Sequence, residues 1–334
     1  KGTVRGEGIT SGAPTMKDLQ AKAGHFKGKI VLAAALPAEM THDDSAAALK
    51  IVQEMTDGAL AYLMPSGKAL AMTMSGTPNS RAGMRPKIPT AIIATEHYDL
   101  LNRLLARGMP VTAEINLPST TSAKPVQAFN IIGEIRGSEK PDEVVIIGAH
   151  MDSWDLATGA TDNGTGTAAV LEALRAIKVM GVAPKRTIRG ILFSGEEEGD
   201  LGSHAYVAAH TAEMPNIQAV LIDDLGTGRI NGWSLQRFEN ERPLMAKAIA
   251  PLNELGVTAL PLEWSRDSDH AAFTAVGVPA FFGVQDVEDY FTVTHHSQFD
   301  TFSHVKPDAL IEGATAFAVT AWELANMDER LPHN

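Results

Sequence analysis

Apolar and polar positions alternate regularly through the second half of the chain. Residues 144–147 form a continuous run of valine and isoleucine that ends at Gly148, which is typical of a strand buried on both faces of a parallel sheet. Apolar residues recur at helical spacing through residues 167–180, and another β-like run follows at residues 187–193. Strands that alternate with helices of this length predict a mostly parallel sheet covered by helices.

The same alternation continues to the end of the chain. We expect further strands at residues 129–135, 219–222 and 280–284, a turn at 139–143, and helices at 203–210, 242–255, 271–276 and 306–326. The fold class is therefore predicted as α/β, with a doubly wound, mostly parallel sheet flanked by helices.

The first part of the chain has shorter predicted elements. Strands are expected at residues 29–32, 59–64, 90–93 and 110–115, helices at 44–55 and 98–107, and a loop rich in Ser, Gly and Pro at 75–85. Residues 118–125 have the composition of a linker. We therefore predict a smaller accessory domain at residues 1–117 and a catalytic domain at residues 118–334.

Composition and charge narrow the possible functions. The chain has no cysteine, so a metal ion must be held by His, Asp or Glu, which favours zinc or a similar divalent ion. A formal net charge of -12 argues against binding nucleic acid or anionic membranes through bulk charge. No apolar run approaches the roughly 20 residues of a membrane span. The start has neither an initiator Met nor a signal-peptide core, so we expect an upstream segment to be missing.

Polar residues of the kind that bind metals follow the predicted strands. Because the carboxyl ends of parallel strands share one sheet edge, we expect these side chains to converge there. A further aspartate precedes the helix at 167–180, and two histidines follow the last strand. The candidates are His150, Asp152, Asp162, Glu196, Glu197, Glu198, Asp223, Asp224, His295 and His296.

So many carboxylates suit two metal ions better than one. A bridging Asp162, with a histidine and one further carboxylate on each ion, gives each metal three protein ligands and leaves room for a shared water. Whichever of Glu196 and Glu197 is left over would be the general base. A His-x-Asp pair, a glutamate run or adjacent aspartates are each common on solvated surfaces, but their joint occurrence at successive strand ends favours a metal site.

Several motifs in the second half resemble one known family. They read G-A-H-M-D-S, G-A-T-D-N-G-T-G, S-G-E-E-E-G-D-L-G-S, I-D-D-L-G, S-D-H-A-A-F and H-S-Q-F-D-T, in that order. This pattern is similar to the co-catalytic zinc exopeptidases, which include bacterial leucyl aminopeptidases and glutamate carboxypeptidases. The longer matches H-M-D-S-W-D, A-P-K-R-T-I-R, H-H-S-Q-F-D-T and N-M-D-E-R-L-P most resemble the plasma glutamate carboxypeptidase (carboxypeptidase Q) branch. The resemblance covers about residues 120–334.

The resemblance implies two zinc ions and a catalytic base. Asp162 would bridge the ions, and Glu196 matches the base that takes a proton from the bridging water and passes it to the leaving amine. One ion would be held by His150, Asp162 and Asp224, and the other by Asp162, Glu197 and His296. His295 is expected to be a neighbour rather than a ligand.

The resemblance also implies supporting roles beside the ligands. Asp152 would orient His150, and Asp300 would orient His296. Family members often have a cis peptide after the bridging aspartate, which here is the bond from Asp162 to Asn163.

Other parts of the chain match the family less specifically. Residues 1–117 resemble a protease-associated domain, a β-rich α+β unit, through K-G-K-I-V-L at 27–32 and I-P-T-A-I-I at 88–93. Thr161 stands where many aminopeptidases have an aspartate, and Asn163 stands where carboxypeptidase Q-like members have one. Neither change removes a ligand.

The implied function is a metal-dependent exopeptidase of carboxypeptidase or dipeptidase type that acts on dipeptides or short peptides. Arg266, His270 and Tyr290 are candidates for the substrate pocket. The alternatives are an aminopeptidase of the same family, a noncatalytic receptor-like relative, and a single-metal acyltransferase relative that cyclises amino-terminal glutamine. We further expect a secreted or periplasmic protein, with a cytoplasmic location as the alternative, and a homodimer.

Overall fold

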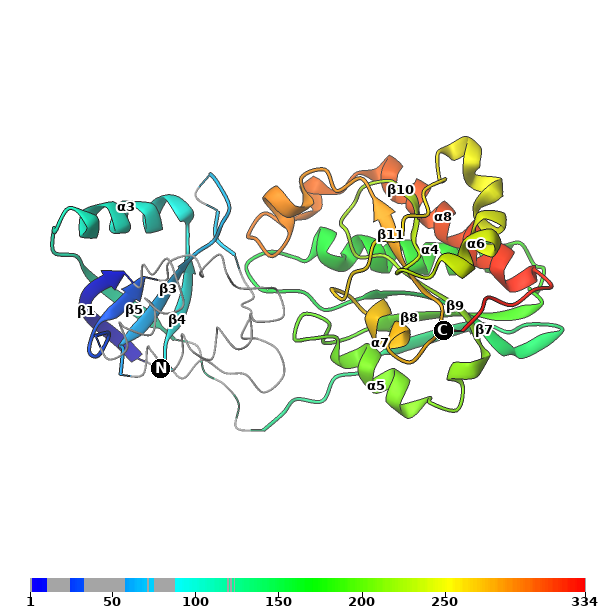
Figure 1. Cartoon of the computed structure of the whole chain (residues 1–334), viewed down its shortest axis with the longest axis horizontal. Coiled ribbons are helices and arrows are strands. Elements are labelled where there is room, and N and C mark those ends of the chain that lie inside the picture. Colours follow the sequence, from blue (N-terminus) through cyan, green and yellow to red (C-terminus); the bar gives the residue numbers. More distant parts are fainter. Residues whose placement is uncertain are drawn as a thin grey trace. The chain divides into compact units, whose positions relative to one another are not determined.

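The chain folds into two compact units, Lys1–Val126 and Gln127–Asn334 (Figure 1). The predicted boundary follows residue 117 and the observed boundary follows residue 126, so the expected linker at 118–125 lies between them. The expected helix at 44–55 and loop at 75–85 fall outside the described residues. The computed structural model describes residues 2–10, 25–32, 58–70, 72–74, 88–118, 120, 122 and 124–333.

The first unit contains a five-stranded sheet in the order β4-β3-β2-β1-β5. β1, β2, β3 and β4 pair in parallel, and β5 pairs antiparallel to β1. A helix, α3, follows β4. The sequence did not predict β1, because its small and charged residues lack an apolar run. The bounds are β1 (Gly2–Thr10), β2 (Ile30–Leu32), β3 (Ala61–Pro65), β4 (Thr90–Ile93), α3 (Thr95–Ala106) and β5 (Thr112–Leu117).

The second unit is built on a six-stranded sheet in the order β10-β11-β9-β7-β8-β6. The four inner strands are parallel, and the edge strands β6 and β10 are antiparallel to their neighbours. This confirms the predicted mostly parallel α/β sheet. The bounds are β6 (Ile131–Ile135), β7 (Lys140–His150), β8 (Arg186–Phe193), β9 (Ile217–Ile222), β10 (Ile230–Ser234) and β11 (Ala280–Gln285).

Helices cover both faces of this sheet (Figure 1). Alternate residues of β7 point to opposite faces: Val145 and Ile147 belong to a core cluster shared with α4 and α8, whereas Val144 and Ile146 belong to one shared with α5 and α7. The central strand is therefore buried on both sides, as its apolar run predicts. The bounds are α4 (Thr165–Val179), α5 (Leu201–Ala209), α6 (Arg242–Ile249), α7 (His270–Thr274) and α8 (Pro307–Asn326).

Three local features differ from the sequence-based expectation. Residues 139–143 are predicted as a turn, but Lys140 begins β7, and the pairing with β8 shifts in register between Lys140 and Val144. The helix predicted at 242–255 is α-helical only to Ile249 and continues as a 3-10 helix, where Pro251 has no N–H to donate. β10 was not predicted because asparagine and glycine interrupt its apolar pattern. No helix among the described residues is both long and apolar enough to cross a membrane.

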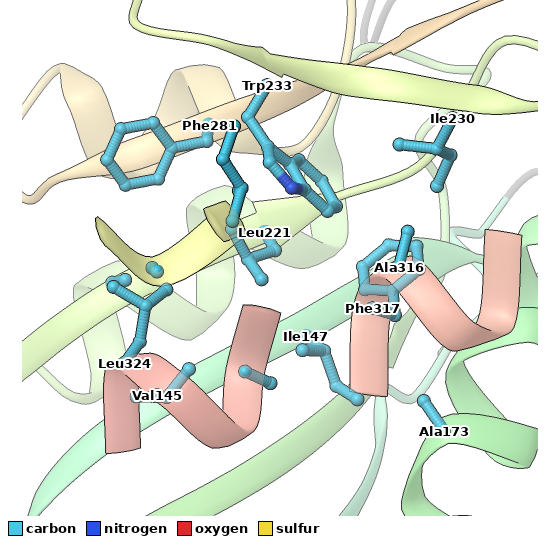
Figure 2. Packing of buried hydrophobic residues seen from close by; sticks show 14 of the residues in the cluster. Val145, Ile147, Ala173, Leu221, Ile230, Trp233, Phe281, Ala316, Phe317 and Leu324 are labelled. Atoms are coloured by element: carbon cyan, nitrogen blue, oxygen red, sulfur yellow. The ribbon is translucent and has the colours of Figure 1, made fainter. Parts of the chain in front are cut away.

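The larger core cluster predicts a strong effect of one substitution. Phe317 of α8 is fully buried, and its ring meets that of Trp233 edge-on at 5.1 Å (Figure 2). Phe317→Ala is expected to lower the free energy of unfolding by about 3–5 kcal/mol, because it removes buried apolar area and leaves a cavity. Denaturant unfolding measures the change. The control is Phe302→Ala, at a ring that is 82% exposed, and a comparable loss there would contradict the prediction.

Candidate metal centre

The predicted metal-binding residues converge because of the strand order. β7 lies between β8 and β9, and these three neighbouring strands are parallel. His150 is the last residue of β7, Glu196 and Glu197 follow the end of β8, and Asp224 follows the end of β9. The strands that follow β7 in the chain lie on opposite sides of it, with β8 on one side and β9 on the other. Open α/β sheets form their binding crevices at such a reversal of strand order, at the carboxyl ends of the strands.

Asp162 lies between two histidines. It lies in the segment Ala160–Gly164 directly before α4, where the backbone of Asp162 and Asn163 is not helical, and its side chain is buried. Its Oδ1 is 3.3 Å from Nε2 of His150, and its Oδ2 is 3.5 Å from Nε2 of His296. The Asp162–Asn163 peptide bond is cis, as the family resemblance implied. Each carboxylate oxygen therefore faces a different histidine.

Each of these histidines also meets a second carboxylate. Nε2 of His150 is 3.0 Å from Oδ1 of Asp224, and Nε2 of His296 is 3.0 Å from Oε2 of Glu197. Ligands about 2.0–2.2 Å from a tetrahedral zinc ion lie about 3.3–3.6 Å from one another, which is close to these spacings. Two groups of side chains that share Asp162 are therefore spaced so that they could hold a metal ion: Asp162 with His150 and Asp224, and Asp162 with His295 and His296.

The charges of the site fit a cation. Burial raises the pKa of Glu197, and the carboxylate of Asp162 raises it further; burial also raises the pKa of Asp224. Burial alone would raise the pKa of Asp162 as well, but His150 and His296 lower it to about 2. Among the described residues, Oε1 of Glu197 is buried without a hydrogen-bond partner. A buried carboxylate oxygen needs a positively charged partner. Carboxylate oxygens and imidazole nitrogens together are a set of ligands that binds zinc.

Glu196 lies at the edge of the first ligand group. Its Oε2 is 3.9 Å from Nε2 of His150. Burial raises the pKa of Glu196 well above its usual range, and the nearby charges of Asp224 and Asp269 raise it further. A carboxylate that holds a proton more readily than usual, next to a ligand group, suits a general base that works near neutral pH.

Comparison with known proteins identifies the family. Residues 130–321, more than half of the chain, match Peptidase family M28. The chain belongs to peptidase family M28. Carboxypeptidase Q from Pongo abelii is 31% identical over 98% of this chain and 70% of its own length. The predicted resemblance to metallo-exopeptidases is therefore confirmed, and the protein is a hydrolase of that class.

Solved structures support the same assignment. The peptidase M28 precursor from Shewanella amazonensis SB2B is 31% identical and superposes with a TM-score of 0.81, over 99% of this chain and 76% of that one. A zinc aminopeptidase from Bacillus subtilis has a similar fold, with a TM-score of 0.68 at 23% identity over 98% of this chain and 76% of that one. The α/β fold class predicted from the sequence is thus that of the M28 peptidases.

Asp152 contacts both the first histidine and the glutamate loop of this M28 chain. Nδ1 of His150 is 3.0 Å from the backbone carbonyl of Asp152, whereas the Asp152 carboxylate is 3.8 Å away. That carboxylate instead accepts hydrogen bonds from the backbone N–H groups of Glu196 and Glu197, at 3.3 Å each. The expected orientation of His150 therefore uses a main-chain atom, and the Asp152 side chain fixes the loop that carries the base.

Asp300 holds the backbone beside Asp162. Its carboxylate accepts hydrogen bonds from the N–H and hydroxyl of Thr161, at 2.6 and 2.8 Å, and from the N–H of Asp162, at 3.1 Å. The family resemblance implied a different role for Asp300, which was to orient His296. Thr161, which in the sequence is only a departure from the family pattern, therefore donates two hydrogen bonds to the Asp300 carboxylate.

Asn163 makes hydrogen bonds at the site that the sequence did not predict. Its amide donates hydrogen bonds to the backbone carbonyl of Asp223, at 2.8 Å, and to Oδ1 of Asp224, at 3.1 Å. Its carbonyl accepts the N–H of Gly166, where any side chain would clash with it. The only sequence signal is its position next to Asp162. Asn163 thus links the loop that carries Asp162 to the one that carries Asp224.

The three candidates for the substrate pocket lie in different surroundings. His270 is fully buried and stacked on Phe282, and burial lowers its pKa to about 4, so it has the position of a core residue and not of a pocket wall. Tyr290 is buried beside the centre, where burial and then the charge of Asp162 raise its pKa. Arg266 is exposed, with its guanidinium 4.2 Å from the ring centre of Trp264.

The contacts of Asp300 predict a change in metal affinity. Asp300→Ala removes the acceptor that fixes Thr161 and Asp162, and we expect zinc affinity to fall about 10- to 100-fold. Competition with a chelator measures the affinity. Asp142→Ala, at an exposed aspartate on the same unit, is the control. Equal zinc affinity in the Asp300 variant and the control would show that these hydrogen bonds do not support the site.

Proposed function

We propose that this M28 peptidase removes single residues from short peptides by means of two zinc ions that share Asp162. His150 and Asp224 would complete one site, and Glu197 and His296 the other. The observation that carries the proposal is the placement of the two Asp162 oxygens, one facing each histidine at 3.3 and 3.5 Å.

Glu196 is proposed as the general base. When bound, the two ions would polarise the peptide carbonyl and lower the pKa of a water between them toward about 7. Glu196 would accept the proton of that water and deliver it to the leaving amine. The hydrogen bonds from its own backbone and that of Glu197 to Asp152 hold the base in place.

The proposed direction is that of a carboxypeptidase or dipeptidase. The likeness to carboxypeptidase Q over nearly the whole chain supports it. The test is hydrolysis of an unblocked dipeptide beside its N-acetylated and C-amidated forms, with and without a chelator. We expect hydrolysis to be lost on C-amidation and in the chelator.

The other outcomes of this assay separate the alternatives. Loss on N-acetylation alone would identify an aminopeptidase, and loss on either block would identify a dipeptidase that reads both ends. No hydrolysis of any peptide with added zinc would favour a receptor-like relative and overturn the proposal.

We also propose a protease-associated role for the first unit, a homodimer, and a secreted or periplasmic location. Two observations support an accessory domain. The first unit has its own sheet of short strands, and the candidate metal ligands all lie in the second unit. Light scattering during size-exclusion chromatography tests the dimer, and fractionation of the source cells tests the location.

A further inference from the structure

An exposed tryptophan contacts two arginine side chains that have no acidic partner within residues 124–333. The guanidinium carbon of Arg237 lies 4.3 Å from the ring centre of Trp264, and that of Arg266 lies 4.2 Å from the same centre. Within residues 124–333, neither arginine forms an ion pair with a carboxylate. Other arginines of this unit do so, each with a glutamate: Arg175, Arg186, Arg189, Arg229 and Arg242.

The two positive charges lie close together. Since each is near the same ring centre, at most about 8.5 Å separates the two guanidinium carbons, which is about one Debye length at physiological salt. Like charges at this distance repel each other, and an anion that contacts both relieves the repulsion. The contact with the indole ring helps to position both guanidinium groups, and each group has N–H donors that can bind a carboxylate.

The loop that carries Arg237 is held in an uncommon conformation. Gln236 and Arg237 both have a positive φ, 48° and 74°, which few residues other than glycine adopt. Gln236 is almost fully buried, donates a hydrogen bond to Oγ of Ser234 at 3.2 Å, and accepts one from the N–H of Ser265 at 2.9 Å. Such backbone persists where surrounding contacts impose it, often at ligand sites. Gln236 thus ties the loop of Arg237 to the segment of Trp264 and Arg266.

This group lies near the metal centre along the chain. Arg266 is three residues from Asp269, a distance of at most about 11 Å between Cα atoms. Asp269 is fully buried and close enough to Glu196, His150 and Asp224 to act on them electrostatically. Arg266 therefore starts within about 11 Å of a residue that lies beside the metal centre. The carboxylate nearest in sequence, Asp267, lies 3.4 Å from the hydroxyl of Ser265.

We propose that Arg237 and Arg266, stacked on Trp264, form a subsite that binds a carboxylate of the peptide substrate. The proposal rests on the proposed peptidase function, because it assigns the group to the same substrate. The carboxylate comes either from the free carboxyl terminus or from an acidic side chain. Both sources present the same two oxygens, so the test must distinguish them.

Four peptides separate these sources. The first two are a short neutral peptide with a free carboxyl terminus and its C-terminal amide. The other two are C-amidated peptides that end in Glu or in Gln. In the zinc-loaded full chain, Arg237→Gln and Arg266→Gln are expected to raise Kd about fivefold or more for the peptide that carries the recognised carboxylate, measured by titration calorimetry. Kd for the matched uncharged peptide should change less than about twofold, and kcat for the peptide with a free carboxyl terminus should be nearly constant.

Two further variants make the result specific. Trp264→Leu keeps both charges but removes the ring that positions them, and we expect it to raise Kd for the same peptide. Arg175→Gln, which removes an exposed charge from α4, is the control and should behave as the parent protein. If the arginine variants raise Kd equally for charged and uncharged peptides, or for none, the subsite does not exist.

A binding measurement separates this proposal from the peptidase function. Titration calorimetry of the same four peptides, on a Glu196→Gln background, needs no hydrolysis. If no peptide is hydrolysed by the parent protein but the carboxylate-bearing one still binds through both arginines, the subsite stands and the peptidase function fails. If hydrolysis proceeds and binding does not depend on the arginines, the peptidase function stands and the subsite fails.

Discussion

Glu196→Gln is expected to lower kcat/KM by about 10²–10⁴-fold while the fold and the bound metal are retained. The amide has nearly the shape of the carboxyl group but cannot accept and return a proton. Glu196 lies 3.9 Å from Nε2 of His150, beside the ligand groups but outside the two pairs at 3.0 Å, so its loss should leave those pairs intact. Peptide hydrolysis and elemental analysis measure the two effects.

The neighbouring glutamate gives a matched control. Glu198 carries the same side chain in the same run but has no proposed role, and Glu198→Gln is expected to keep activity within a few-fold of the parent. If Glu196→Gln retains activity at the level of Glu198→Gln, Glu196 is not the base.

Asp162→Ala is expected to have a larger effect, because Asp162 faces both ligand groups. Removing it takes one ligand from each proposed ion, so we expect zinc content to fall to near zero and kcat/KM to fall by at least about 10⁴-fold. Asp224→Ala, which removes a ligand from one group only, should leave more zinc bound. Elemental analysis after gel filtration distinguishes the two variants.

Asp223→Asn is the control for the loss of a buried aspartate. Burial raises the pKa of Asp223 to about 8, so its carboxyl group is mostly protonated at neutral pH and an amide replaces it closely. We expect this variant to keep its zinc. Unchanged zinc in Asp162→Ala would defeat the bridging assignment.

The framework of the second unit can be predicted from the sequence because it depends on local patterns. The apolar run at 144–147 needs burial on both faces, and polar residues at the ends of parallel strands must share one edge. His150, Glu197 and Asp224 can therefore be grouped from the sequence alone. β10 could not be predicted because its own residues have no regular apolar pattern. It is a strand because it pairs with β11.

The supporting contacts cannot be predicted in the same way. Asp152 binds His150 through a backbone carbonyl, and Asp300 binds the backbone of Thr161 and Asp162. These bonds depend on where main-chain atoms lie after folding, which the identity of the residues does not reveal. The stacking of Arg237 on Trp264 likewise joins two segments distant in sequence.

The most direct test of the shared metal centre is hydrolysis of an unblocked short peptide while zinc is titrated into the chelated protein. We predict no activity without metal and a maximum at two equivalents of zinc per chain. Full activity in the chelator, or a maximum at one equivalent, would contradict a two-metal centre bridged by Asp162.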